Sequence, residues 1–201
     1  MEIQEFLKYR LDLIKESQDE DGFINESSFI NCIIPSMLDA KLIDSEDFTE
    51  TYYSSEIDGS QVKINGYIIN DSGERLQLFI LNDESISLDN NILEISLKDY
   101  YEGIFKKAAN FTNKAIKGHL NEIQDIGAIN ALINQMSSSL GADQFDVIEI
   151  FLVSATATIE NRGQIPQPKR IDFKDETIKI KYTKNRETVE KEILIIKRLV
   201  D

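Results

Sequence analysis

Two apolar segments on either side of a short polar stretch constrain the fold of this chain most strongly. The segments Val62–Ile69 and Leu76–Leu81 flank Asn70-Asp71-Ser72-Gly73-Glu74. Apolar runs bounded by Asn, Asp, Ser and Gly are typical of two strands joined by a turn. Because Phe79-Ile80-Leu81 is apolar at consecutive positions, we expect the second strand to be covered on both faces. The pattern therefore predicts a hairpin in a sheet with other elements packed on both sides.

Helical periodicity predicts four helices around this hairpin. Apolar residues recur at helical spacing over residues 3–16, 27–38, 97–118 and 127–140. Asn25 or Ser27 can cap the second helix, and Pro35 inside it should kink or split it. We expect these helices to form layers against the sheet.

Further strands are predicted at 48–54, at the apolar run Val147–Val153, and at 193–196. The segments Ile171–Phe173 and Thr177–Tyr182 predict a second hairpin that turns at Lys174-Asp175-Glu176. Ile165–Pro168 predicts a break. This order of elements predicts an α/β (α+β) fold, a mixed central sheet flanked by helices, in one domain over residues 1–201.

The formal net charge of −14 argues against nucleic acid as a partner, because such a surface repels phosphate backbones. Basic residues gather only near Lys169, Arg170 and Lys174, and along 179–186, and we interpret both groups as solvated strand faces. The N-terminus lacks the basic start and apolar run of a signal peptide, and no apolar run has membrane-spanning length. We therefore expect a cytoplasmic protein without membrane contact.

Three segments carry a resemblance to a known family. They are Ile64-Asn65-Gly66-Tyr67 with the apolar strand after it, Ile148–Ser154, and Ile193–Leu199. On these segments the chain resembles the N-terminal region of the abortive-infection phage-resistance (AIPR) proteins. Family members usually continue well past the third segment, so the resemblance implies the N-terminal domain of a longer protein.

Some members of that family look like nucleases of the restriction-endonuclease type, with Asp-Gly-Tyr followed by a Gln-x-Lys strand. The resemblance therefore implies a restriction-endonuclease-like core. Carried over residue by residue, the Asp falls on Asn65, the Gln on Ile80 and the Lys on Asn82. Metal-dependent cleavage needs carboxylates to hold Mg²⁺, and these three residues supply none. The chain thus matches the scaffold and departs from its chemistry.

Three functions remain open on these observations. The first is a non-catalytic binding and assembly domain that uses no cofactor and binds a protein partner, its own copies or a following domain. The second is a metal-dependent nuclease with an atypical site, for which Asp58, Asp71 and Asp83 are the candidate Mg²⁺ ligands. The third is an acidic mimic of nucleic acid that occupies a partner's basic groove. Acidic residues gathered on one face would favour the mimic, and an even spread would favour the assembly domain.

Overall fold

The computed structural model of the chain describes residues 3–86, 95–120, 127–156, 159–162, 165–168 and 170–201. Its helices are α1 (Ile3–Glu16), α2 (Glu26–Asp39), α3 (Lys98–Ile116), α4 (Ala128–Ser137) and α5 (Ser139–Gln144), with a 3₁₀ turn, η1, at Asp83–Ile86. The strands of its main sheet are β1 (Thr49–Ile57), β2 (Ser60–Ile69), β3 (Arg75–Leu81), β4 (Val147–Val153), β7 (Glu176–Lys184) and β8 (Glu187–Val200). A separate ribbon pairs β5 (Ile159–Arg162) with β6 (Ile165–Pro168).

The main sheet is mixed, and its strands lie in the order β1-β2-β3-β4-β8-β7. The first three strands form an antiparallel meander, whereas β3, β4 and β8 run parallel and β7 returns antiparallel to β8. The long connection between parallel β3 and β4 contains α3, α4 and α5, as a parallel crossover requires. The mixed α+β fold is confirmed, and so is the placement of Val62–Ile69, Leu76–Leu81 and Val147–Val153 in one sheet.

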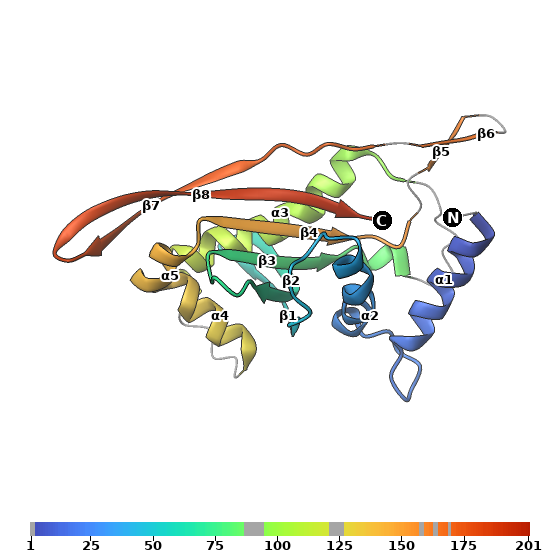
Figure 1. The fold of residues 1–201 in the computed structure, drawn as a ribbon, viewed down its shortest axis with the longest axis horizontal. Coiled ribbons are helices and arrows are strands. Elements are labelled where there is room, and N and C mark those ends of the chain that lie inside the picture. The colour runs from blue at the N-terminus through green and yellow to red at the C-terminus, as the bar shows by residue number, and fades with distance from the viewer. Residues whose placement is uncertain (1–2, 87–94, 121–126, 157–158, 163–164, 169) are drawn as a thin grey trace.

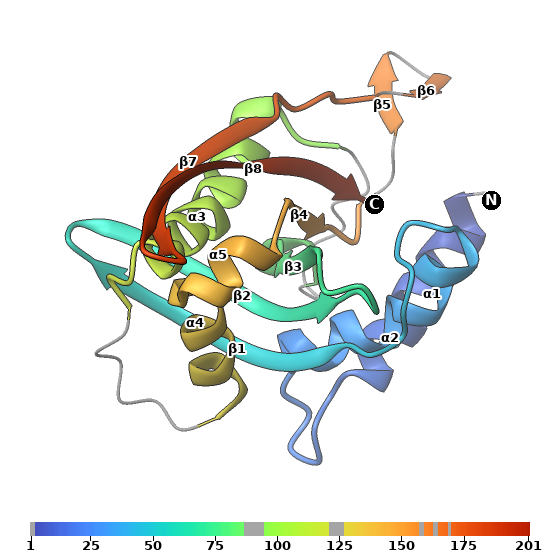
Figure 2. The same ribbon diagram turned by 60° about the vertical axis from the view of Figure 1, so that its left-hand side comes forward.

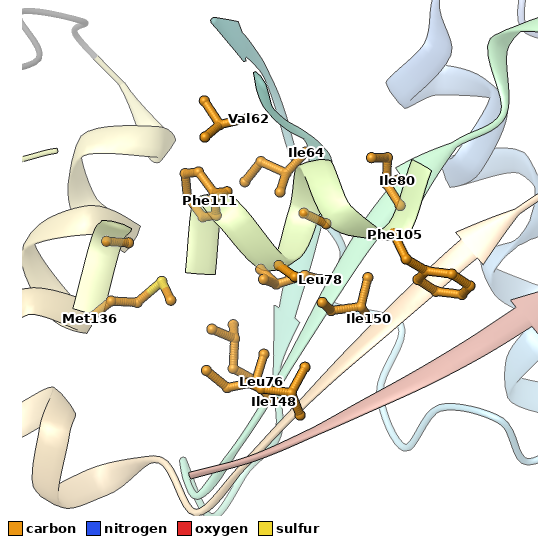
Figure 3. Close-up of a cluster of buried hydrophobic side chains, with 14 of the residues drawn as sticks. Val62, Ile64, Leu76, Leu78, Ile80, Phe105, Phe111, Met136, Ile148 and Ile150 are labelled. Atoms are coloured by element: carbon orange, nitrogen blue, oxygen red, sulfur yellow. The ribbon is translucent and has the colours of Figure 1, made fainter. Parts of the chain in front are cut away.

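Helices cover both faces of the sheet (Figure 1). On one face α3 and α4 pack against β2, β3 and β4, and Figure 3 shows Phe105, Phe111 and Met136 in one cluster with Leu78 and Ile150. On the other face α1 and α2 cover Phe79 and Phe151, whose rings stack with centroids 5.3 Å apart. Two cores explain why β3 is apolar at consecutive positions.

Two of the predicted helices differ in detail. Pro35 lies within α2, which continues from Glu26 to Asp39 without being split, and Asn25 caps it by accepting a hydrogen bond from the Ser28 N–H. The helix predicted over 127–140 ends at Ser137, because the next residue, Ser138, has extended backbone angles. The Ser138 hydroxyl accepts from the Gly141 N–H and starts α5, so a serine cap divides the predicted helix.

The sequence prediction placed the second hairpin wrongly. In the structure the hairpin consists of β7 and β8, which turn at Asn185-Arg186, and both turn residues have positive φ (52° and 69°). Lys174-Asp175-Glu176 precedes the hairpin, and Ile171–Phe173 is not a strand. The break predicted at Ile165–Pro168 is strand β6. No helix in the described parts of the chain combines the length and the apolar character needed to cross a bilayer.

Candidate functional site

Asn65, where the resemblance led us to expect an Asp in nuclease members, is built into the framework of the sheet. Its side chain is 0% exposed, and its Oδ1 accepts a hydrogen bond from the Leu81 N–H (2.9 Å). Its Nδ2 donates to Glu26 Oε2 (2.6 Å), and its backbone carbonyl accepts from the Ser27 hydroxyl (2.6 Å). The carboxamide thus joins β2 to the end of β3 and to the start of α2. This role needs both a donor and an acceptor. An amide has both, whereas an ionised carboxylate has no donor.

The other two motif positions are also structural. Ile80 is fully buried in the core beneath α3 (Figure 3). Its hydrocarbon side chain has no atom that can bind a metal ion. Asn82 follows β3, where its Nδ2 donates to the Ser154 hydroxyl (3.0 Å) and its Oδ1 accepts from the Tyr100 hydroxyl (2.7 Å). Asn82 therefore ties the ends of β3 and β4 to α3.

A charged cluster lies beside Asn65. The Lys63 side chain is only 5% exposed, and its Nζ lies 2.6 Å from Glu26 Oε2 and 2.6 Å from Asp83 Oδ1. The Tyr52 ring centroid lies 5.5 Å from the same Nζ. Burial alone would lower the pKa of Lys63, but its hydrogen bonds to Asp83 and Glu26 outweigh burial and hold the pKa above its usual value. The ammonium group therefore stays charged between two carboxylates.

The three aspartates named as alternative Mg²⁺ ligands lie apart. Asp58 and Asp71 lie in the turns at opposite ends of β2, and both are exposed. The Lys114 ammonium hydrogen-bonds Asp58 (2.9 Å) and lowers the pKa of that carboxyl, whereas Asp83 bonds Lys63. Among the residues whose placement is described, no group of three or more His, Cys, Asp or Glu side chains could hold a metal ion.

A small cleft of about 130 Å³ opens next to the charged cluster. Lys63, Asn82 and Lys107 contribute to its lining, together with Tyr100 and Glu84. The Tyr100 hydroxyl lies 2.7 Å from Asn82 Oδ1 and 2.9 Å from Glu84 Oε2. Burial and the neighbouring Glu84 raise the pKa of Tyr100 to about 12, so the phenol remains a neutral hydrogen-bond donor.

Of the basic residues expected on strand faces, Lys179, Lys181 and Lys184 lie on β7, whereas Arg170 and Lys174 precede it outside any strand and Arg186 lies in the turn. Lys169 lies outside the described residues, and Arg170 is exposed beside Asp172. The lysines of β7 form ion pairs with Glu192 (Lys179, 2.9 Å), Glu190 (Lys181, 2.5 Å) and Asp143 (Lys184, 2.5 Å). No continuous basic face results from them.

Sequence reasoning missed two members of the charged cluster, Glu26 and Lys63. Lys63 had a detectable signal, because it lies two residues before Asn65 in an apolar strand and so shares its face. Glu26 had none, because its place in the cluster depends on how α2 packs against β2.

Comparison with known families gives one match. The sequence model described as the abortive infection phage resistance protein N-terminal domain matches residues 29–182, which is more than half of the chain. The matched region extends from α2 into β7 and contains Lys63, Asn65 and Asp83. No curated protein and no solved structure matches the chain.

Proposed function

This chain belongs to the family of abortive infection phage resistance protein N-terminal domains, and from that membership we propose that it serves phage resistance as a non-catalytic binding and assembly domain. Its partners are proteins: its own copies, a following domain or another component of the response. Its scaffold is nuclease-like, and its catalytic positions have been converted to structural ones.

The observation that carries this proposal is the position of the Lys63 ammonium group. In a metal-dependent nuclease a divalent cation lies between carboxylates and activates water. Here Lys63 Nζ lies within 2.7 Å of oxygens from both Glu26 and Asp83. An ammonium group balances the two negative charges, but it offers no vacant coordination position for water or phosphate.

The spread of acidic residues supports assembly over mimicry of nucleic acid. Exposed carboxylates occur on α1, on the turn after it, on β1, on α3 and on β8, which lie on different sides of the molecule (Figures 1 and 2). A nucleic-acid mimic would need them in one continuous band that matches a partner's basic groove.

The first experiment measures cleavage. The purified chain is incubated with duplex and single-stranded DNA in buffer with Mg²⁺ or Mn²⁺, and we expect no cleavage. Metal-dependent cleavage that is lost in Asp83→Asn and retained in Asp71→Asn would contradict the proposal. Asp71 is the matched control because it is an exposed aspartate in a turn away from the cluster.

The second candidate function, a nuclease with an atypical site, rests on the same cluster. A lysine and two carboxylates beside a cleft are residue types that metal-dependent nucleases use. If this function holds, Glu26→Gln with Asp83→Asn removes phage protection by the complete protein in cells. The assembly proposal predicts that the double variant keeps protection as long as its abundance is unchanged, because neither carboxylate takes part in chemistry.

A further inference from the structure

The main sheet is open and has two long edges. The end strands β1 and β7 each contain nine residues, and Figure 2 shows them at opposite margins of the sheet. In the described parts of the chain, β1 pairs only with β2, and β7 pairs only with β8. Long unpaired edges expose backbone donors and acceptors that another strand can use.

The β7 edge is basic on one face. Ile178 and Ile180 are buried in the core under α3, so the alternate residues Lys179 and Lys181 lie on the opposite face, where both are exposed.

The β1 edge is acidic on the same face of the sheet. Tyr53 contributes to the same core, and the exposed residues Glu50 and Glu56 alternate with its buried positions. Tyr52, between them, meets Lys63 on the face opposite that core. If the β1 strand of a second copy continued the sheet next to β7, its glutamates would lie on the same face as the lysines of β7.

We propose that the β1 edge of one copy of this chain pairs head to tail with the β7 edge of a second copy. The inference rests on the proposed assembly role and names its surface and its partner. An antiparallel register with Glu56 opposite Lys179 places a carboxylate beside a lysine, and it brings the Glu50 end of β1 toward the Asn185-Arg186 turn that follows β7. Directly opposed charges of opposite sign stabilise a sheet, whereas like charges destabilise it.

The charges also disfavour the symmetric alternatives. Pairing β7 with β7 around Ile180 places Lys179 opposite the second copy's Lys181. Pairing β1 with β1 brings its exposed glutamates, Glu50 and Glu56, toward those of the second copy. Lys179 and Lys181 of β7 already form ion pairs with glutamates of the neighbouring strand β8, Glu192 and Glu190. A head-to-tail contact leaves one edge free on each terminal copy, so association continues beyond two copies unless the rotation closes a ring.

The experiment follows the mass of the chain by light scattering at about 0.15 M salt, where a Debye length of about 8 Å screens long-range repulsion between acidic copies. Lys179→Thr with Lys181→Thr alters the β7 edge and keeps residues that favour strands. Glu50→Lys with Glu56→Lys reverses the β1 edge. Lys98→Thr with Lys106→Thr, on the exposed side of α3, is the matched control. Circular dichroism verifies that each variant is folded.

We expect the wild type and the α3 control to reach at least twice the mass of one chain as concentration rises. Each edge variant alone stays at one chain mass. An equimolar mixture of the two edge variants gives twice that mass and no more. The intact β1 edge of the β7 variant pairs with the intact β7 edge of the β1 variant, and the two edges that remain are both altered. If the β1 variant does not fold, Glu50→Gln with Glu56→Gln replaces it in the mixture.

A wild type that stays at one chain mass, edge variants that associate as the wild type does, or a mixture that remains at one chain mass would each overturn the inference. None of these results changes the cleavage assay, so the proposed function is tested separately.

Discussion

At the scale of single residues, Lys63 stabilises the folded chain by balancing the negative charges of Glu26 and Asp83. Replacing it with Met keeps the length of the side chain but removes the charge that Glu26 and Asp83 share. Removing one partner of a buried ion pair costs about 3–5 kcal/mol, and since Asp83 is half exposed we expect about 2–4 kcal/mol off the free energy of unfolding. Urea unfolding measures this loss. Lys98→Met, in an exposed pair with Glu102 on α3, should cost about 0.5 kcal/mol or less.

The contribution of Lys63 should also depend on pH. Its pKa in the folded chain is raised above the ordinary 10.5, because hydrogen bonds to Asp83 and Glu26 outweigh burial. A raised folded pKa gives stability that is fully present below the unfolded pKa and is lost as pH rises through the folded pKa. The difference in unfolding free energy between wild type and Lys63→Met should therefore stay constant near neutral pH and shrink above about pH 10.5. A difference that disappears already near neutral pH would contradict this assignment.

Two glycines should respond to alanine in opposite directions. A Cβ at Gly66 would meet the Phe48 ring and lie 2.8 Å from the Thr49 carbonyl oxygen, so Gly66→Ala should cost about 1–3 kcal/mol through overpacking. A Cβ at Gly103, inside α3, would meet nothing within 4 Å, and Gly103→Ala should stabilise by about 0.5–1 kcal/mol because alanine favours helix. Thermal unfolding of both variants measures the difference. Equal shifts in melting temperature would show that crowding of a Cβ at Gly66 by Phe48 and Thr49 does not lower stability.

At the scale of elements, the sequence predicted those whose pattern is set by burial. Strands β2, β3 and β4 are apolar because helices cover them on both sides, and α1 and α3 carry one apolar stripe each. The β7–β8 hairpin was misplaced because its outer face is charged and its turn uses Arg186 at positive φ, which Arg rarely adopts. Similarly, the sequence located Asn65 and Ile80 on the correct strands and Asn82 directly after the second, but the contact of Glu26 with Lys63 depends on packing between distant segments.

The turn of the β7–β8 hairpin gives a prediction at this scale. Asn185 and Arg186 both have positive φ, as a two-residue type I′ turn requires, and Gly is preferred at its second position. Arg186→Gly removes backbone strain of about 1–2 kcal/mol but gains flexibility in the unfolded chain, so we expect a net stabilisation of about 0.5–1 kcal/mol. Arg186→Ala keeps the Cβ and should give no gain. A melting temperature that is the same for all three chains would rule out strain at this turn.

At the scale of the whole molecule, charge and topology act together. The strands β2, β3 and β4 form the buried centre of the sheet, and the charged strands β1 and β7 form its margins. Lys179 and Lys181 at the β7 margin are matched by glutamates on β8, so they do not offset the net charge of −14 by forming a basic face. Under the proposed assembly role, these margins contact other proteins strand to strand and do not contact a phosphate backbone.

Binding to DNA tests this view of the surface. In a gel-shift assay at low salt, where electrostatic attraction or repulsion is strongest, we expect no retarded DNA, because the −14 chain repels phosphates before short-range contacts form. Glu190→Gln with Glu192→Gln frees Lys181 and Lys179 from their partners and changes the net charge from −14 to −12. This variant should also fail to bind, since a few freed lysines on one strand do not overcome the field of the remaining acids. Tight binding by the wild type that weakens steeply as salt is added would instead mean that phosphate contacts release counterions, and it would restore a DNA-binding function derived from the nuclease scaffold.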